Sequence, residues 1–176
     1  WPRSGWLGPN LVRLPPDAVL RREVSLTLDD GPDLEVTPAV LELLSRYGAR
    51  ASFFCIGERA QRYPDLCREI VARGHSIENH TQHHSHWFSL LGMRGFAREI
   101  GAGQQTIASI AGQMPLFFRA PAGLRNPLLE PVLARLGLKL QFLASQTALF
   151  QRSLAHAQYT ALPELMWPES PAAESI

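Results

Sequence analysis

"LTLDDGP", residues 26–32, closes an apolar run with two adjacent aspartates, Asp29 and Asp30, and a Gly-Pro pair. The run over 24–30 predicts a strand that is apolar enough to be buried. Gly31 and Pro32 predict a turn directly after that strand. Because two neighbouring carboxylates repel each other, their place at a strand end indicates a role beyond the turn itself.

This strand is the first of a regular alternation along the chain. Further strands are predicted over 51–57, 75–80, 116–121 and 138–144. The helices between them are predicted from an N-cap at Thr37 to Gly48, over 64–73, over 93–111, and from Asn126 to Gly137. Alternating strands and helices predict an α/β fold with parallel strands joined by right-handed crossovers. A (β/α) barrel and an open doubly wound sheet both fit this pattern.

Apolar spacing within two of the helices predicts which side chains face the core. The expected buried residues are Val40, Leu44 and Tyr47 in the first helix, and Phe96, Ile100 and Ile107 in the helix over 93–111. Cys55 and Cys67, the only cysteines, are predicted to be buried free thiols.

Composition limits the function classes. The chain has 176 residues, 45% of them hydrophobic, and a net charge of +1, which suits one folded domain and offers no basic excess for nucleic acid. No stretch is apolar enough to span a bilayer. The chain begins at Trp1 rather than Met, which fits a processed product or a fragment. Residues 1–22, rich in Pro and Gly, are expected to form an irregular lead-in.

Three groups of polar residues follow predicted strands. Asp29 and Asp30 end the first strand, His80 ends the third, and "RAPAG" (119–123) ends the fourth. Since the carboxyl ends of parallel strands meet on one face, we expect these groups to lie together.

The segment "NHTQHHSH" (79–86) carries two histidines, His80 and His84, four positions apart. This spacing suits two ligands of one metal ion, with a third ligand supplied by Asp29 or Asp30. An Asp-His-His set is typical of a catalytic divalent metal, with zinc the leading choice. The other aspartate is then placed to act as a general base.

Each group also has a plainer explanation. An acidic pair after a strand is usually a solvated turn, a His-rich segment is often polar surface, and Arg119 could be structural. Taken alone, each of these explanations is the better one. Their predicted meeting on one rim favours a functional site.

These residues carry a family resemblance. "LTLDDGP", "NHTQHH" and "RAPAG" resemble, in order and separation, the first three motifs of the polysaccharide deacetylase family, also called the NodB-homology domain or carbohydrate esterase family 4. The resemblance implies a distorted (β/α) barrel over 23–145 and removal of N-acetyl groups from chitin-, peptidoglycan- or exopolysaccharide-like polymers. It also implies a divalent metal, most often zinc, and an extracytoplasmic or cell-envelope location.

The resemblance also implies individual roles. Asp29 becomes the general base, oriented and kept charged by Arg119. The implied metal ligands are Asp30, His80 and His84. Pro121 would shape the groove and the backbone N–H of Ala122 would stabilise the oxyanion. His83 and His86 match no motif and are expected at the surface or behind the ligands, while Trp87 could line a sugar groove or simply pack.

The C-terminal part departs from the family. No Asp follows Asp65, and the only late histidine, His156, comes too early to match the family's general acid. Residues 146–176 are expected to form a divergent tail, and the barrel is expected to be incomplete through a frameshift, a truncation or divergence. Two alternatives to a polysaccharide deacetylase therefore stay open: a relative that binds metal or glycan without turnover, and a metal amidase acting on a small substrate.

Overall fold

The computed structural model describes residues 24–141, so the predicted lead-in, the tail and His156 lie outside the described residues. One parallel sheet holds five strands: β1 (Leu26–Gly31), β2 (Ala51–Cys55), β3 (Ser76–Asn79), β4 (Phe117–Phe118) and β5 (Lys139–Leu140). The strands follow one another in the order β1-β2-β3-β4-β5. The predicted α/β fold with a parallel sheet is therefore confirmed.

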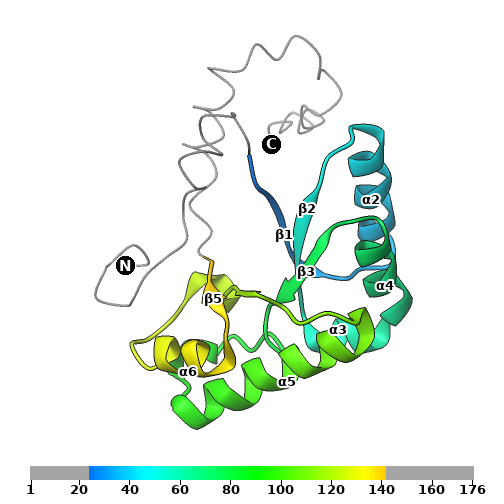
Figure 1. Ribbon diagram of the computed structural model, residues 1–176. Coiled ribbons are helices and arrows are strands. Elements are labelled where there is room, and N and C mark those ends of the chain that lie inside the picture. Colours follow the sequence, from blue (N-terminus) through cyan, green and yellow to red (C-terminus); the bar gives the residue numbers. More distant parts are fainter. Residues whose placement is uncertain (1–23, 142–176) are drawn as a thin grey trace, which may run out of the picture. The chain divides into compact units, whose positions relative to one another are not determined.

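The helices form a second layer in the same order as the strands. They are α2 (Val36–Arg46), α3 (Gly57–Arg62), α4 (Pro64–Ala72), α5 (Met93–Ala111) and α6 (Leu129–Leu136), with short 3-10 turns η2 (Phe88–Leu90) and η3 (Pro121–Gly123). Helix α4 packs against α2 and α5, and α5 packs against α6, as the course of the ribbon in Figure 1 shows. Strands and helices that advance in one direction are typical of a barrel, because a doubly wound sheet reverses its strand order at a switch point.

The core lies in two clusters, one on each half of this layered arrangement. Strands β1–β3 and helices α2 and α4 contribute residues such as Leu41, Phe53 and Ile70 to the first. The second gathers Phe96, Phe118 and other side chains from α5, β4, α6 and β5. Phe96, Ile100 and Ile107 are fully buried, as their spacing predicts.

Several sequence predictions need correction. Strand β1 is an edge strand of the described sheet and Leu26 is 41% exposed, so the expected burial of this strand is wrong. On α2, Leu44 is buried as predicted, but Tyr47 is 43% exposed, because the buried stripe runs through Thr37, Leu41 and Leu44. Thr37 lies inside α2 and accepts the backbone N–H of Asp33. The Asp33 carboxylate accepts the first free N–H groups of the helix instead.

Two other features concern composition. Cys55 and Cys67 are free and buried, as predicted. In residues 24–141, no helix combines the length and apolar character that a membrane crossing requires.

Candidate metal centre

The two aspartates of β1 reach one site because the strand bulges between them. In the pairing with β2, Asp29 lies opposite Phe54 and Gly31 opposite Cys55, which leaves Asp30 without a partner. Asp30 has a φ of 65°, in the left-handed region that non-glycine residues rarely adopt. An extra residue of this kind redirects side chains that would otherwise alternate between the two faces of the sheet. The Arg59 Nη1 atom donates to the Asp30 carbonyl oxygen at 2.6 Å.

Three side chains converge beside this bulge. The Nε2 atoms of His80 and His84 each lie 3.2 Å from Oδ1 of Asp30. One ligand atom from each residue lies within 4.8 Å of the others. Nδ1 of His80 lies 2.7 Å from the carbonyl oxygen of Arg119, which can accept only from a protonated Nδ1. This contact assigns the ring proton to Nδ1 and leaves the Nε2 lone pair facing the site.

Hydrogen bonds of Asn79 and Thr81 fix the loop that carries the two histidines. Asn79, fully buried, accepts the N–H of Thr81 at 2.8 Å and donates to the carbonyl of Ile100 on α5 at 2.8 Å. Thr81 in turn accepts the N–H of His84 through its hydroxyl at 2.9 Å. Thr81 and His84 both have positive φ values, 71° and 52°. These hydrogen bonds stabilise a strained conformation that turns both imidazoles to the same side.

Helices α3 and α5 approach this loop at glycines. A Cβ on Gly103 would lie 2.8 Å from the backbone carbon of Thr81, and one on Gly57 would lie 2.2 Å from Oε1 of Gln82. The missing side chains let both helices contact the loop directly. The N–H groups of Gly57 and Glu58 donate to the carbonyls of Thr81 and Gln82.

Arg119 lies under the site and is 4% exposed. Its guanidinium forms an ion pair with Asp29, donates to the hydroxyl of Thr27 at 3.1 Å and stacks 4.0 Å from the centre of the Phe54 ring. Burial lowers the pKa of Arg119, and the Asp29 carboxylate opposes that shift. Since arginine starts from a very high value, the side chain stays charged and holds Asp29 in one orientation.

The protonation states of Asp30 and His84 favour the binding of a cation at the three converging residues. Close contact with the His80 ring, aided by nearby positive charge, lowers the pKa of Asp30 despite its partial burial. Burial is the main cause that lowers the pKa of His84. At neutral pH the set therefore offers one carboxylate and a neutral imidazole at His84, the states that bind a metal ion.

Of the remaining predicted residues, Pro121 and Ala122 lie in the segment after β4, and His86 and Trp87 lie in the segment after β3. Pro121 is buried in η3, while Ala122 is exposed and has a φ of 52°. His86 contacts the edge of the His84 ring, with centroids 6.4 Å apart, and Trp87 is 72% exposed. Their proposed roles remain predictions.

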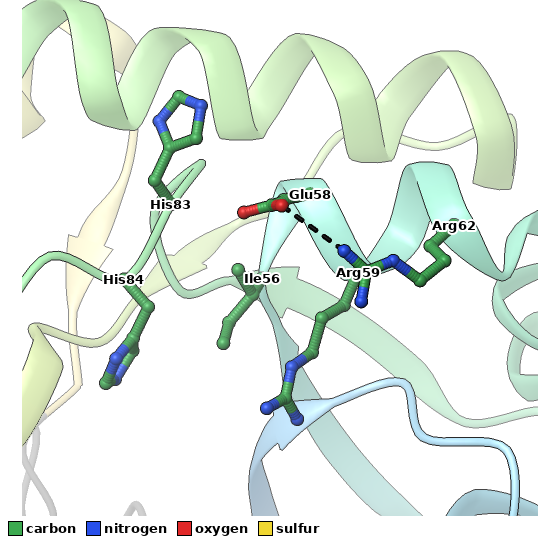
Figure 2. Close-up of a pocket in the computed structure, with 6 residues that line it drawn as sticks. All are labelled: Ile56, Glu58, Arg59, Arg62, His83 and His84. Atoms are coloured by element: carbon green, nitrogen blue, oxygen red, sulfur yellow. Dashed lines mark hydrogen bonds and ion pairs between the residues drawn. The ribbon is translucent and has the colours of Figure 1, made fainter.

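A pocket that sequence reasoning missed borders the site. It is lined by Ile56, Glu58, Arg59, Arg62, His83 and His84 (Figure 2). Its arginines come from α3, a helix of six residues that the sequence pattern did not separate from its neighbours. Figure 2 shows His83 pointing toward the long helix α5, where its Nδ1 lies 3.0 Å from Glu99, and His84 pointing away from it.

The comparisons with known proteins agree with one another on the family. The family model described as "Polysaccharide deacetylase" matches residues 17–141. A peptidoglycan-N-acetylglucosamine deacetylase of Bacillus cereus is 37% identical over 103 residues, which are 58% of this chain and 37% of that protein. A chitooligosaccharide deacetylase of Azorhizobium caulinodans is 36% identical over 117 residues, 66% of this chain and 55% of that protein. The chain thus matches about half or less of the length of these relatives.

Among solved structures, a family 4 carbohydrate esterase from Streptomyces lividans in complex with acetate is similar, with a TM-score of 0.63 and 38% identity. The match covers 66% of this chain and 60% of that one. The two proteins are therefore similar in fold over more than half of each chain.

Proposed function

The chain belongs to the polysaccharide deacetylase family, and on that premise we propose that it removes N-acetyl groups from a glycan that contains N-acetylhexosamine. The family depends on a divalent metal. We assign the activity to residues 23–145, the predicted catalytic domain. One observation carries the proposal: Asp30, His80 and His84 converge while Arg119 holds Asp29 beside them.

The donor set fits a divalent cation. Two imidazole nitrogens and one carboxylate oxygen are the ligand types of catalytic zinc sites, and three protein ligands leave a coordination position open. The proton on Nδ1 of His80 is held by the Arg119 carbonyl, so Nε2 is free to bind. We therefore propose zinc as the bound ion, held by Asp30, His80 and His84. When bound, such an ion supplies Lewis acidity that polarises the acetamide carbonyl and acidifies water.

The remaining catalytic roles belong to the chain's own residues. Asp29 accepts the proton of the water that attacks the carbonyl carbon. Arg119 keeps Asp29 charged and oriented for that step. The N–H of Ala122 donates to the oxygen that becomes negative during the attack. The carbon–nitrogen bond then breaks as the nitrogen gains the proton that Asp29 took from the water, and the products are an amine and acetate.

Substrate and location complete the proposal. The substrate is a polymer or oligomer of N-acetylated sugar, and we place the protein outside the cytoplasm because such polymers are found there. The third sequence hypothesis, an amidase for a small substrate, would use the same residues. A glycan is favoured by the family to which the chain belongs.

The test is acetate release by the zinc-loaded protein from N-acetylglucosamine oligomers and from peptidoglycan, beside an Asp29→Asn variant. We expect release by the native chain and a loss of about 10²- to 10⁴-fold in the variant, the usual effect of removing a general base. Zinc content should stay equal in both, because this substitution leaves the three proposed ligands in place. A folded, zinc-loaded native chain that releases no acetate would contradict the proposal and favour binding without turnover.

A further inference from the structure

We propose that the pocket lined by Ile56, Glu58, Arg59, Arg62, His83 and His84 binds a carboxylate carried by the glycan, on the sugar next to the one that loses its acetyl group. We call it the basic pocket. The inference rests on the proposed function, because it adds a preference for anionic over neutral glycan to the same site.

The position of the basic pocket is the first argument. His84 belongs both to the pocket wall and to the three residues that converge on the metal centre. Arg59, on the opposite wall, donates to the backbone of Asp30, a second member of that set. The pocket is therefore the immediate neighbour of the metal centre. A sugar chain whose acetamide reaches Asp30 and His84 extends its next unit along this wall.

The charge of the basic pocket is the second argument. Arg59 and Arg62 contribute two permanent positive charges, and Glu58 contributes one negative charge. The hydrogen bond that Arg59 donates through Nη1 ends on a neutral carbonyl, while its charge also lowers the pKa of the nearby Asp30 and Asp33 carboxyl groups. Arg62 contacts Glu58 (Figure 2) across a long 3.4 Å. Both side chains are more than half exposed. An ion pair of this kind is weak and readily exchanged.

The chemistry of the side chains selects the ligand. A guanidinium presents paired N–H donors that match the two oxygens of a carboxylate, and it binds such a group more strongly than a neutral hydroxyl. Ile56 adds a small apolar wall that suits the carbon frame of a sugar or its ether substituent. A glycan of N-acetylglucosamine alone brings only neutral hydroxyl groups to these arginines. A sugar with a lactyl ether or a uronic acid brings the matching charge.

Binding measurements can test this without turnover. The full chain with Asp29→Asn, loaded with zinc, is titrated by calorimetry with a peptide-free tetrasaccharide of alternating N-acetylglucosamine and N-acetylmuramic acid. The same sugar as its methyl ester is the neutral control. We expect the acid to bind about 3- to 5-fold more tightly than the ester at low salt, as for exposed ion pairs, and the difference to shrink at about 1 M salt. Equal affinity at low salt would overturn the inference, as would binding of neither sugar.

Two variants with opposite expected effects sharpen the test. Arg62→Gln should reduce the acid-to-ester affinity ratio, and Glu58→Gln should increase it because Arg62 loses its competing partner. Arg68→Gln is the matched control, since Arg68 is also an exposed helical arginine with a nearby carboxylate, Asp65, and it does not line the pocket. The acid-to-ester affinity ratio of Arg68→Gln should equal that of the parent protein, which carries Asp29→Asn alone. If all three variants have the same acid-to-ester affinity ratio, the basic pocket does not distinguish the carboxylate from its neutral ester.

The outcomes also separate this inference from the proposed function. A native chain that releases acetate equally from acid and ester keeps the deacetylase proposal and contradicts the pocket. A chain that prefers the acid but releases no acetate keeps the pocket and contradicts the deacetylase. Preference seen only when a peptide is attached would mean that a peptide carboxylate, not the sugar's own, is the group recognised, and this too would overturn the assignment.

Discussion

The carbonyl oxygen of Arg119 accepts the Nδ1–H of His80 at 2.7 Å, while the guanidinium of the same residue holds Asp29. A single residue thus orients a proposed metal ligand through its backbone and the proposed base through its side chain. The two contacts are separable by mutation, because a side-chain substitution leaves the carbonyl in place.

Arg119→Met should therefore affect the base far more than the metal. We expect kcat to fall by about 10²-fold or more as Asp29 loses its orienting partner. Zinc affinity should change by less than about threefold, because the partner of His80 persists. Steady-state kinetics and competition with a chromophoric chelator measure the two effects. An equal loss of zinc affinity and kcat would show that the side chain supports the whole site.

Removing the metal should lower thermal stability. Zinc at 100 times its dissociation constant adds about 2.7 kcal/mol to the free energy of unfolding, so chelation should reduce Tm by several degrees. His84→Ala should remove most of this difference, because a proposed ligand is lost. His86→Ala is the control, since His86 is exposed and outside the converging set. A chelator effect that survives in His84→Ala would place the ion elsewhere.

Two glycines of helix α5 give a matched pair of substitutions. Gly103→Ala should destabilise the protein by about 1–3 kcal/mol, because the new Cβ would meet the backbone of Thr81 at 2.8 Å. It should also weaken zinc binding by displacing the loop between His80 and His84. Gly101→Ala, whose Cβ would lie 4.0 Å from Leu136, should instead stabilise by up to about 1 kcal/mol. Urea unfolding of both variants measures the contrast, and equal free energies would contradict the close contact.

Acidification should lower the stability of the fold through His75, which lies outside the metal centre. His75 is buried, its Nδ1 accepts the N–H of Ala51 at 3.3 Å, and burial, aided by Arg73 and Arg50, lowers its pKa. Because the folded state holds this proton less tightly than the unfolded state, stability rises with pH through the window below about 6.5 and is lost on acidification.

His75→Gln should remove that contribution. Its free energy of unfolding should fall less steeply between about pH 7 and pH 5 than that of the native chain. His86→Gln, at an exposed position, should keep the native slope. Chemical unfolding at several pH values, with zinc absent, gives the slopes. Parallel curves for the native chain and His75→Gln would show that another group titrates.

Local patterns account for what the sequence predicts well. The helix predicted over 93–111 begins and ends as expected, because its apolar period and the following Gly112 are signals contained within the segment. Helix α4 ends within one residue of its predicted end for the same reason. The grouping of Asp30 with His80 follows from their place at strand ends, and His84 joins them through its spacing of four residues from His80.

Features that depend on pairing between segments escaped prediction. The bulge at Asp30 exists only in the register of β1 against β2, and no composition signal marks it. The contact of Arg59 with Asp30 joins residues 29 positions apart. Strand β4 is shorter than predicted because pairing, not β-propensity, sets where a strand ends.

The unidirectional strand order also sets a sequence of events during synthesis. Each new strand of the described sheet pairs with the one made just before it, so the sheet can grow from its N-terminal edge as the chain emerges. All three proposed ligands have been made once His84 is complete, whereas the partner of Asp29 arrives 35 residues later, at Arg119. The three proposed ligands are therefore made before the one residue whose carbonyl orients His80 and whose guanidinium holds Asp29, so the ligand set is complete in sequence before it is fixed in space.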